Sequence, residues 1–375
     1  MKLNDFLNGG IRNNYDTIAR FYEGNLKGQA FLFRALLQMK KSQKLRSAHE
    51  KEGLHVPPFL IASIVSECNL RCEGCYAWAN GSCADDEEGS EQMLIHDTLS
   101  PAQWGKLFRE ALDLGVSFIL LAGGEPLLNR EILDEAADCK GMIFPIFTNA
   151  TLIDKGYVNF FDAHRNLIPV ISIEGNDEMT DKRRGQGIAA RIQDAMSLLT
   201  KKKLLYGVSI TVTSKNVDAV LEEAFIEKLR SDGCGLVFFI EYVPAQSHTL
   251  DLVLSPTDQQ RLRDRVIALR EENRSHGLIL LSFPGDEKAM GGCLAAGKGF
   301  FHINSRGGAE PCPFSPYSTQ NVKKDSLEEI LSSSFFEKVR EIGSDMADGP
   351  EGGCSLFRHR AQIEALQNAP TPPAL

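Results

Sequence analysis

The sequence predicts an α/β protein whose core is a partial (β/α)6 TIM-type barrel, between an N-terminal helical segment and a small C-terminal α+β domain. Six short runs of β-branched and apolar residues recur between residues 59 and 244, and helical segments separate them. Runs that are apolar at nearly every position are typical of strands buried on both faces of a parallel sheet. This alternation stops after residue 281, which indicates a second domain.

The expected bounds follow from the same pattern. We expect a helical segment over 1–57, the core over 58–285, the small domain over 286–360 and a flexible tail over 361–375. The strands are expected at 59–66, 117–124, 142–149, 167–175, 205–213 and 236–244. In parallel α/β folds the functional groups lie at the C-terminal ends of the strands.

Composition excludes several classes of protein. The chain has 375 residues, of which 43% are hydrophobic and 24% are charged, as in an ordinary globular protein. It contains no run of about 18 apolar residues that would span a membrane, and its N-terminus lacks an apolar signal core. The net charge of −9 favours no nucleic-acid partner. Nine cysteines, an odd number, fit a reducing cytoplasm better than a disulfide scaffold.

The N-terminal segment predicts one amphipathic helix. Residues 29–46 place an apolar stripe at helical spacing and end in a Lys- and Arg-rich turn, which suits the negative end of the helix dipole. The stripe consists of Leu32, Ala35, Leu36 and Met39. We expect this helix to pack on the core; the alternative is a helix for a membrane surface or a partner.

Two helices of the core have clear boundary signals. The first is capped by Ser100, with Pro101 in its first turn, Gln103 completing a capping box and Gly115 ending it. The second starts at Ser255-Pro256 and runs to about Asn273. In the C-terminal domain we expect a hairpin that turns at Gly307-Gly308 and one amphipathic helix over 325–342.

Three cysteines follow the first expected strand with the spacing Cys68-x3-Cys72-x2-Cys75. Structural zinc usually has four ligands, and no histidine with suitable spacing lies nearby. Three thiolates hold three corners of a [4Fe–4S] cluster and leave one iron without a protein ligand, free to bind a substrate. Gly74 allows the tight turn that lets the three sulfurs converge.

This loop, with Tyr76 directly after it, resembles the radical S-adenosylmethionine (SAM) superfamily. Two further motifs carry the resemblance: "GGEP", at the end of the second expected strand, and "SIEG", at the end of the fourth. The resemblance implies a partial barrel, a [4Fe–4S] cluster that binds SAM, and a set of residues around SAM. That set is Tyr76, Gly123, Gly124, Glu125, Pro126, Thr148, Asn149, Ser172, Glu174, Arg183 and Arg184.

Each of these residues has an implied role. Gly123, Gly124 and Glu125 would meet the SAM amino group, because glycines permit close approach and a carboxylate suits an ammonium. Ser172 and Glu174 would accept from the ribose hydroxyls. Tyr76 would lie by the adenine, Thr148 and Asn149 would line the pocket, and Arg183 or Arg184 would pair with the SAM carboxylate; for these arginines a solvated pair is an equal alternative.

Glu241 and Tyr242 end the sixth expected strand and therefore point toward the same pocket. They are candidate catalytic residues that accept or donate a proton, although lining of the barrel explains them equally well. The implied reaction is reductive cleavage of SAM to a 5′-deoxyadenosyl radical, which abstracts hydrogen from a C–H bond of the substrate.

The last three cysteines resemble an auxiliary iron–sulfur domain of the SPASM or twitch type. Cys293 and Cys312 flank the expected hairpin, and Cys354 follows the expected helix. The resemblance implies one auxiliary [4Fe–4S] cluster that accepts an electron or anchors the substrate. Its fourth ligand is left open among Cys83, His359, Glu310 and the substrate itself, because Phe357 stands where a fourth thiol is expected.

The sequence therefore predicts a cytoplasmic radical SAM enzyme that oxidises its substrate or forms C–C or C–heteroatom bonds. The substrate is a peptide or a small metabolite, and a flavodoxin or ferredoxin would donate electrons. One alternative is a lipid or membrane-held substrate, which rests only on the basic N-terminal helix. An alternative of another class is a non-catalytic iron–sulfur or zinc-binding protein, which would not need "GGEP" and "SIEG".

Overall fold

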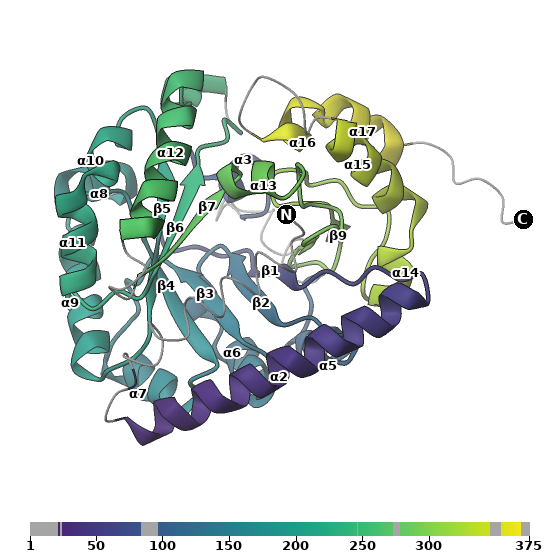
Figure 1. Ribbon diagram of the computed structural model, residues 1–375, viewed down its shortest axis with the longest axis horizontal. Coiled ribbons are helices and arrows are strands. Elements are labelled where there is room, and N and C mark those ends of the chain that lie inside the picture. The colour runs from purple at the N-terminus through teal and green to yellow at the C-terminus, as the bar shows by residue number, and fades with distance from the viewer. Residues whose placement is uncertain are drawn as a thin grey trace, which may run out of the picture.

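The computed structural model describes residues 22, 25–83, 97–245, 247–272, 278–345 and 354–368. Its centre is one nine-stranded sheet with the order β7-β6-β5-β4-β3-β2-β1-β8-β9 (Figure 1). β1 to β7 run parallel in chain order, so each strand pairs with its predecessor, and the sheet stays open with β7 and β9 at its edges. The strands are β1 (Phe59–Val65), β2 (Phe118–Gly123), β3 (Phe144–Thr148), β4 (Leu167–Ile173), β5 (Gly207–Val212), β6 (Leu236–Glu241), β7 (Ile279–Phe283), β8 (His302–Ile303) and β9 (Ala309–Glu310).

All six strands expected from the apolar runs are confirmed, and the structure adds a seventh parallel strand. β7 pairs with β6 from Leu236↔Ile279 to Ile240↔Phe283. Its sequence, ILLSF, is apolar at four of five positions, but its burial alternates along the strand. The C-terminal hairpin is also part of the same sheet, because β8 pairs with β1 in parallel while β9 pairs with β8 in antiparallel.

Helices fill the connections between the strands. α5 (Pro101–Leu114) has the expected capping box between Ser100 and Gln103, and Gly115 ends it in the left-handed conformation with φ 97°. The helix expected from Pro256 is also confirmed. The remaining helices of this part are α6 (Arg130–Asp138), α7 (Lys155–Ala163), α8 (Asp177–Arg184), α9 (Ile188–Lys201), α10 (Val217–Leu221), α11 (Glu223–Ser231) and α12 (Pro256–Glu272).

The N-terminal helix α2 (Leu26–Lys51) lies across the N-terminal ends of the strands (Figure 1). Leu32 packs with Ile168 and Leu205, which stand at the beginning of β4 and just before β5. Further along, the buried Arg46 donates from Nη1 to the Gly115 carbonyl at 2.5 Å and to Ser117 Oγ at 2.8 Å. The helix therefore packs on the core as expected and closes the end of the sheet opposite the strand C-termini.

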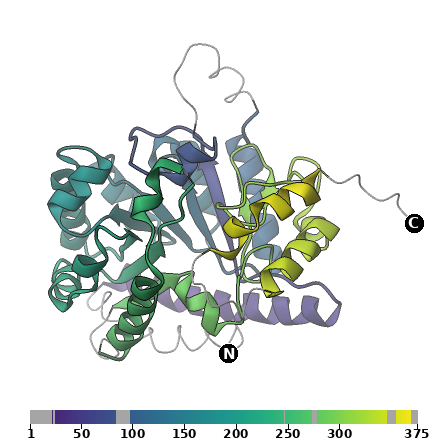
Figure 2. The ribbon, with the colours of Figure 1, turned by 90° about the horizontal axis from the view of Figure 1, so that it is seen from above.

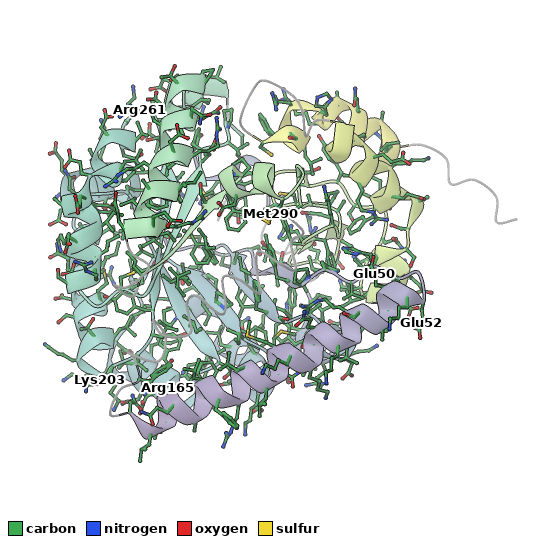
Figure 3. The ribbon with its side chains drawn as sticks, in the orientation of Figure 1. Glu50, Glu52, Arg165, Lys203, Arg261 and Met290 are labelled. Carbon is green, nitrogen blue, oxygen red and sulfur yellow. The ribbon has the colours of Figure 1, made fainter. Side chains whose placement is uncertain are left out.

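The beginning of α2 is anchored by polar contacts as well. Near it, Arg165 Nη1 donates to the Lys203 carbonyl at 3.0 Å, and Figure 3 shows both residues beside the helix. Asn25 caps the helix and also reaches the Lys203 carbonyl from Nδ2 at 3.5 Å. These contacts join α2 to the connections that precede β4 and β5.

The C-terminal part differs from expectation in its helices. The single helix expected over 325–342 is wrong: the structure has α14 (Leu327–Leu331) and α15 (Ser334–Asp345). Ser326 and Glu329 form a capping box that starts α14, and the Ser333 side chain accepts from the Phe336 N–H at 3.2 Å, which starts α15 as a separate helix. α16 (Ser355–Arg358) and α17 (Arg360–Gln367) follow, so a helix occupies part of the segment expected as a tail.

Figures 1 and 2 place these C-terminal helices on one side of the molecule and α9 to α11 on the other. The hairpin turns at Gly307, with φ 90°, as expected. Within the described ranges no helix is both long enough and apolar enough to cross a membrane.

Candidate active site

The candidate site lies at the C-terminal ends of the strands, where the sequence placed it. The cysteine loop follows β1, Gly124 follows β2, Asn149 follows β3, Glu174 follows β4 and Tyr242 follows β6. Because these strands are parallel neighbours, their C-terminal ends meet along one edge of the sheet. Loops that are far apart in the sequence therefore come together there.

The cysteine loop connects β1 to the short helix α3 (Tyr76–Ala79). Within it, the Cys75 N–H donates to the Cys72 carbonyl at 3.3 Å, and all three cysteines are free thiols. Gly74 has φ 65°, and a Cβ built on it would lie 2.5 Å from the Tyr242 hydroxyl oxygen. Gly74 is therefore required both for the turn and for the packing of Tyr242 against the loop.

The two glycines of "GGEP" let the end of β2 approach the cysteine loop. A Cβ on Gly123 would lie 2.3 Å from the Val65 carbonyl oxygen, and one on Gly124 would lie 1.9 Å from the Glu67 carbonyl oxygen. The Gly124 N–H donates to Val65 at 2.9 Å and the Glu125 N–H to Glu67 at 2.8 Å. These glycines thus let the end of β2 pack closely against the backbone of Val65 and Glu67. Their contact with SAM stays a prediction.

Glu125 is buried and accepts three hydrogen bonds from the chain. Thr148 Oγ1 and the Leu127 N–H donate to Oε1 at 2.7 and 3.1 Å, and the Asn149 N–H donates to Oε2 at 2.7 Å. Burial raises the pKa of this carboxyl, while these donors oppose the increase. The predicted pair Thr148 and Asn149 therefore positions Glu125 at the site.

A polar network also fastens the start of the cysteine loop. The Asn149 side chain donates from Nδ2 to Asn69 Oδ1 at 2.8 Å, and Asn69 donates in turn to Thr151 Oγ1 at 2.8 Å. Thr151 Oγ1 donates to Asn149 Oδ1 at 2.6 Å and closes the cycle. Asn69 and Thr151 were not singled out from the sequence, because only the fold brings these positions together.

Glu174 is held between the two predicted arginines. Its Oε1 accepts from Arg183 Nη1 at 2.6 Å and from Arg184 Nη2 at 2.5 Å. Its other oxygen, Oε2, is buried without a hydrogen-bond partner among the described residues. Arg183 Nη1 also donates to Thr211 Oγ1 at 3.0 Å. The hydroxyl oxygens of Ser172 and Ser209 are hydrogen-bonded to each other at 3.1 Å.

The arginines also act on the cysteine loop. Arg184 Nη1 lies 3.9 Å from Cys72 Sγ, and the Arg183 carbonyl accepts from the Glu73 N–H at 3.0 Å. Burial raises the pKa of the Cys72 thiol, and the charges of Arg184 and Arg183 oppose it. For Cys68, burial raises the pKa to about 11, opposed by a hydrogen bond from the Leu70 N–H. Such donors favour the thiolate that binds iron.

The first cysteine loop touches the C-terminal domain directly. The Tyr76 ring packs edge-on against Phe314, with 5.2 Å between ring centroids, and Asn80 Nδ2 donates to the Pro313 carbonyl at 3.1 Å. The charges of Cys75, Cys83 and Cys312 all add to the raised pKa of Tyr76, of which burial is the main cause. Tyr76 therefore stands between the two groups of cysteines; its predicted place beside adenine stays a prediction.

The three C-terminal cysteines lie close to one another and are largely enclosed. Burial raises the pKa of Cys293 and Cys312 well above the ordinary range and that of Cys354 to about 12; Cys354 adds to the raised pKa of both Cys293 and Cys312. Each sulfur accepts from a backbone N–H two residues further on, at Ala295, Phe314 and Leu356, and Cys354 accepts more strongly from the Phe357 N–H. This pattern also occurs at Cys68, and it stabilises sulfur ligands of iron–sulfur clusters.

The candidates for a fourth auxiliary ligand lie in different surroundings. Glu310 is buried and uses both oxygens, since Oε2 pairs with His302 Nδ1 at 2.7 Å and Oε1 accepts from Asn304 Nδ2 at 2.6 Å. His359 Nδ1 contacts Gln362 Oε1 at 3.2 Å at the start of α17. Cys83 lies by the first loop, where burial and the charges of Cys75, Cys68 and Cys72 raise its pKa.

Glu241 and Tyr242 have contrasting environments. The Tyr242 hydroxyl donates to Thr249 Oγ1 at 2.6 Å. Glu241 is only 3% exposed, and neither carboxylate oxygen has a hydrogen-bond partner within the described part of the chain. Burial raises the pKa of Glu241 to about 7, with Arg263 opposing it. A buried carboxyl group that titrates near neutrality suits proton transfer.

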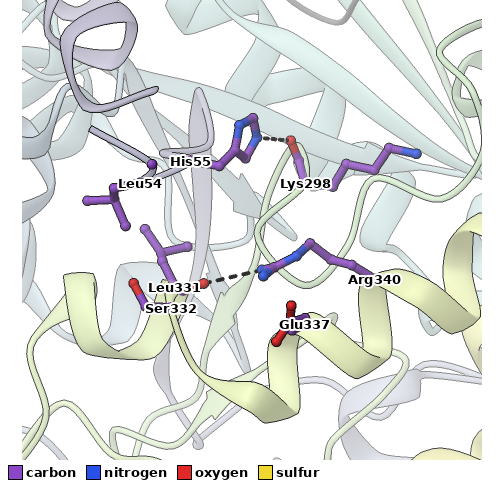
Figure 4. A pocket seen from close by; sticks show the side chains of 8 residues that line it. Leu54, His55, Lys298, Leu331, Ser332, Glu337 and Arg340 are labelled. Atoms are coloured by element: carbon purple, nitrogen blue, oxygen red, sulfur yellow. Dashed lines mark hydrogen bonds between the residues drawn. The ribbon is translucent and has the colours of Figure 1, made fainter. Parts of the chain in front are cut away.

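A separate cavity of about 430 Å³ lies at the other end of the sheet (Figure 4). His55, just before β1, donates from Nε2 to the Lys298 carbonyl at 2.8 Å, and Arg340 donates to the Leu331 carbonyl at 3.3 Å. His55 and Arg340 are thus engaged with the backbone, and the cavity lies before β1 rather than after the strands. We do not assign it to the active site.

The donor sets fit the cofactors that the sequence implied. Three free thiols on one loop suit three corners of a [4Fe–4S] cluster, and the unpartnered Glu174 Oε2 suits a ribose hydroxyl donor. Among the residues that the structure describes, no three His, Cys, Asp or Glu side chains are arranged to hold a single metal ion. Thiolates of a four-iron cluster each bind a different iron and are spaced more widely than the ligands of one ion.

Comparison with known proteins supports the same assignment. Residues 63–224 match the radical SAM superfamily, and residues 293–355 match the SPASM iron–sulfur cluster-binding domain. The chain is 25% identical to an AdoMet-dependent heme synthase of Methanosarcina barkeri over 76% of this chain and 85% of that protein. It is also 25% identical to the PqqA peptide cyclase of Rhizobium meliloti, over 76% of each chain.

A solved structure shares the fold. The crystal structure of Streptococcus suis SuiB bound to precursor peptide SuiA superposes with a TM-score of 0.63 at 19% identity, covering 84% of this chain and 76% of that one. The two domain matches imply SAM and [4Fe–4S] clusters as cofactors, and the relatives with catalytic names indicate an enzyme. This chain belongs to the radical SAM superfamily and carries a C-terminal SPASM iron–sulfur domain.

Proposed function

We propose that this enzyme oxidises a C–H bond of a peptide or a small metabolite, using one cluster to initiate the reaction and a second cluster to accept an electron. The observation that carries the proposal is the contact between the two cysteine groups through Tyr76 and Phe314. Such a contact supports electron transfer between a substrate at the strand ends and the C-terminal cluster. SAM and the first cluster, when bound, supply a hydrogen-abstracting radical and leave methionine and 5′-deoxyadenosine.

The protein's own residues would hold SAM and manage a proton. Cys68, Cys72 and Cys75 would hold the first cluster and leave one iron for SAM. Glu174 would accept a ribose hydroxyl at Oε2, while Arg183 and Arg184 keep Oε1 engaged. Glu125, with Gly123 and the other predicted cofactor residues of the strand ends, would line the rest of the SAM site.

Glu241 would accept the proton that a substrate releases on oxidation. SAM and the two clusters, when bound, would supply the acceptors for the hydrogen atom and the electron that the substrate loses, and a Glu241 oxygen would take the remaining proton. Its pKa of about 7 and its lack of a partner within the described residues support this role. Tyr242 is instead tied to Thr249 and packs on Gly74, which supports a positioning role.

The comparisons support two substrate classes. The PqqA peptide cyclase and SuiB with its precursor peptide favour a peptide, whereas the heme synthase favours a small metabolite. The membrane-held alternative depended on the N-terminal helix, and the Leu32 and Arg46 side chains of that helix are buried against the core. We place the enzyme in the cytoplasm, with a flavodoxin or ferredoxin as electron donor, because nine free cysteines suit a reducing compartment.

Anaerobic reconstitution tests the proposal. The holoprotein should contain about eight irons and eight sulfides per chain and should form 5′-deoxyadenosine from SAM on reduction. Deuterated peptides and metabolites can then be screened for transfer of deuterium into 5′-deoxyadenosine, which identifies the class of hydrogen donor. Zinc without sulfide, or iron without SAM cleavage, would instead support the non-catalytic metal protein.

A further inference from the structure

The N-terminal helix α2 has a second face, which points away from the core. The buried residues of α2, which share its inner face, are Gly28, Leu32, Ser42 and Arg46. Leu26, Phe33 and Leu37 lie on the opposite face, because an α-helix turns by about 100° per residue. Their exposed fractions are 82%, 65% and 52%. Half of the exposed large hydrophobic side chains in the described part of the chain therefore gather on one face of one helix.

The same outer face continues as a row of cations. Lys40, Lys41 and Lys44 follow Leu37 at helical spacing, and all three lysines are exposed. The helix contains seven Lys or Arg residues and a single carboxylate, Glu50 in its last turn, whereas the whole chain has a net charge of −9. Positive charge is thus concentrated on this helix, although the molecule as a whole is acidic.

The helix lies at the end of the sheet opposite the candidate active site. It crosses the N-terminal ends of the strands, and in Figure 1 it forms one border of the molecule. A protein that delivers electrons to the cysteine loop would not dock here, because that loop follows the C-terminal end of β1. A surface that held the outer face of α2 would leave the active-site end of the molecule turned away from that surface.

We propose that the outer face of α2 docks on an anionic lipid surface. Leu26, Phe33 and Leu37 would enter the boundary between the headgroups and the acyl chains, while the lysines would reach anionic headgroups. Five of the six exposed cations of α2 are lysines, which protein–protein interfaces contain rarely, so this face suits lipid better than an acidic protein. The docking is independent of the proposed reaction. It does not require a membrane-held substrate, because the active site lies at the opposite end of the strands.

Vesicle binding by the anaerobically reconstituted full chain tests this docking. The protein should sediment with phosphatidylcholine vesicles that contain about 30% phosphatidylserine and stay in solution with phosphatidylcholine alone. An increase in NaCl from about 0.1 M to about 0.5 M should release it, because salt screens the lysines. Lys40→Gln, Lys41→Gln and Lys44→Gln together should weaken binding by about 10²-fold. Phe33→Ser and Leu37→Ser together should weaken it by about tenfold, since less apolar surface enters the lipid.

Matched controls change the same kinds of side chain elsewhere. Lys155→Gln, Lys182→Gln and Lys324→Gln together remove three exposed lysines from other segments. Leu250→Ser and Ile267→Ser together remove two apolar side chains that are 62% and 58% exposed. Both control proteins should bind vesicles like the unmodified chain, and every variant should form 5′-deoxyadenosine at the unmodified rate, which separates docking from the reaction.

Three results would overturn the proposal. The first is equal binding to vesicles with and without phosphatidylserine, and the second is an equal loss of binding in the α2 variants and their controls. The third is a protein that stays in solution with the phosphatidylserine vesicles at low salt, which would favour an acidic protein as the partner of this face.

Discussion

The fold brings each of the two groups of cysteines together in a different way. In the first group, Cys68, Cys72 and Cys75 lie on one loop, and the end of β2 fixes that loop through backbone hydrogen bonds to Val65 and Glu67. In the second group, Cys293, Cys312 and Cys354 come from three segments that the β8–β9 hairpin and the C-terminal helices bring together. A local loop needs little tertiary structure to converge, whereas the second group exists only in the folded domain.

The charges around the two groups also differ. Arg183 and Arg184 oppose the raised pKa of Cys72, so cations stand beside the first group. Glu287 increases the pKa of all three thiols of the second group. In our interpretation, the first group keeps one iron free for SAM, and the second group holds the cluster that accepts an electron.

Removal of one thiol from the first group should have the largest effect. In a Cys72→Ala enzyme, we expect 5′-deoxyadenosine formation to fall below detection and about half of the iron to be lost, because two thiolates do not retain the first cluster. Cys234→Ala removes a buried thiol that donates to the Leu236 carbonyl and should keep full iron content. SAM cleavage by the Cys72→Ala enzyme at the normal rate would contradict the assignment.

Substitution of Glu241 should separate substrate oxidation from SAM cleavage. Glu241→Gln should lower product formation by about 10²- to 10³-fold, as expected for loss of a general base, while 5′-deoxyadenosine still forms. In the unmodified enzyme, product formation should rise with pH around a midpoint near 7, because Glu241 accepts a proton only after it ionises. A Glu241→Gln enzyme with the same rate and the same pH profile would exclude this role.

A methyl group on Gly123 should destabilise the support of the first loop. Gly123→Ala should lower the free energy of unfolding by about 1–3 kcal/mol, since its Cβ would clash with the Val65 carbonyl. Gly187→Ala is the matched control: Gly187 also has a positive φ, 80°, but nothing lies within 4 Å of its Cβ position. Denaturant titration of both apoproteins measures the difference, and equal losses would show that backbone strain alone matters.

Loss of Arg184 should have the smallest effect. In an apoprotein with Arg184→Gln, the pKa of the Cys72 thiol should increase, because the opposing positive charge 3.9 Å from its sulfur is gone. The pH dependence of Cys72 alkylation measures this shift. Lys182→Gln, which removes an exposed cation from the same helix, should leave the profile unchanged. An unchanged profile for Arg184→Gln would show that this arginine serves only Glu174.

Local signals in the sequence predicted the parts of the fold that have local causes. The capping box of Ser100 and Gln103, the hairpin at Gly307 and six strands with continuous apolar runs were all predicted correctly. β7 was missed although its sequence ILLSF is largely apolar, because a run this short is not distinguished from other buried segments until its pairing with β6 is seen. The break between α14 and α15 was missed because Ser333 acts as a cap inside an otherwise amphipathic pattern. In both cases the tertiary environment decides what the local pattern leaves open.

The same division applies to the site. The cysteine loop and the glycines of "GGEP" have a fixed spacing, so the sequence identifies them. The pairing of Glu174 with both arginines and the cycle of Asn69, Asn149 and Thr151 depend on contacts that only the folded chain creates.

The most direct test asks which of the two clusters has an iron that SAM can reach. Two proteins would be compared by electron paramagnetic resonance, one with Cys68, Cys72 and Cys75 changed to Ala and one with Cys293, Cys312 and Cys354 changed to Ala. We predict that SAM alters the spectrum of the second protein, which keeps the first cluster, and leaves that of the first protein unchanged. A spectrum that responds to SAM when only the C-terminal cluster remains would contradict the assignment of SAM to the first cluster.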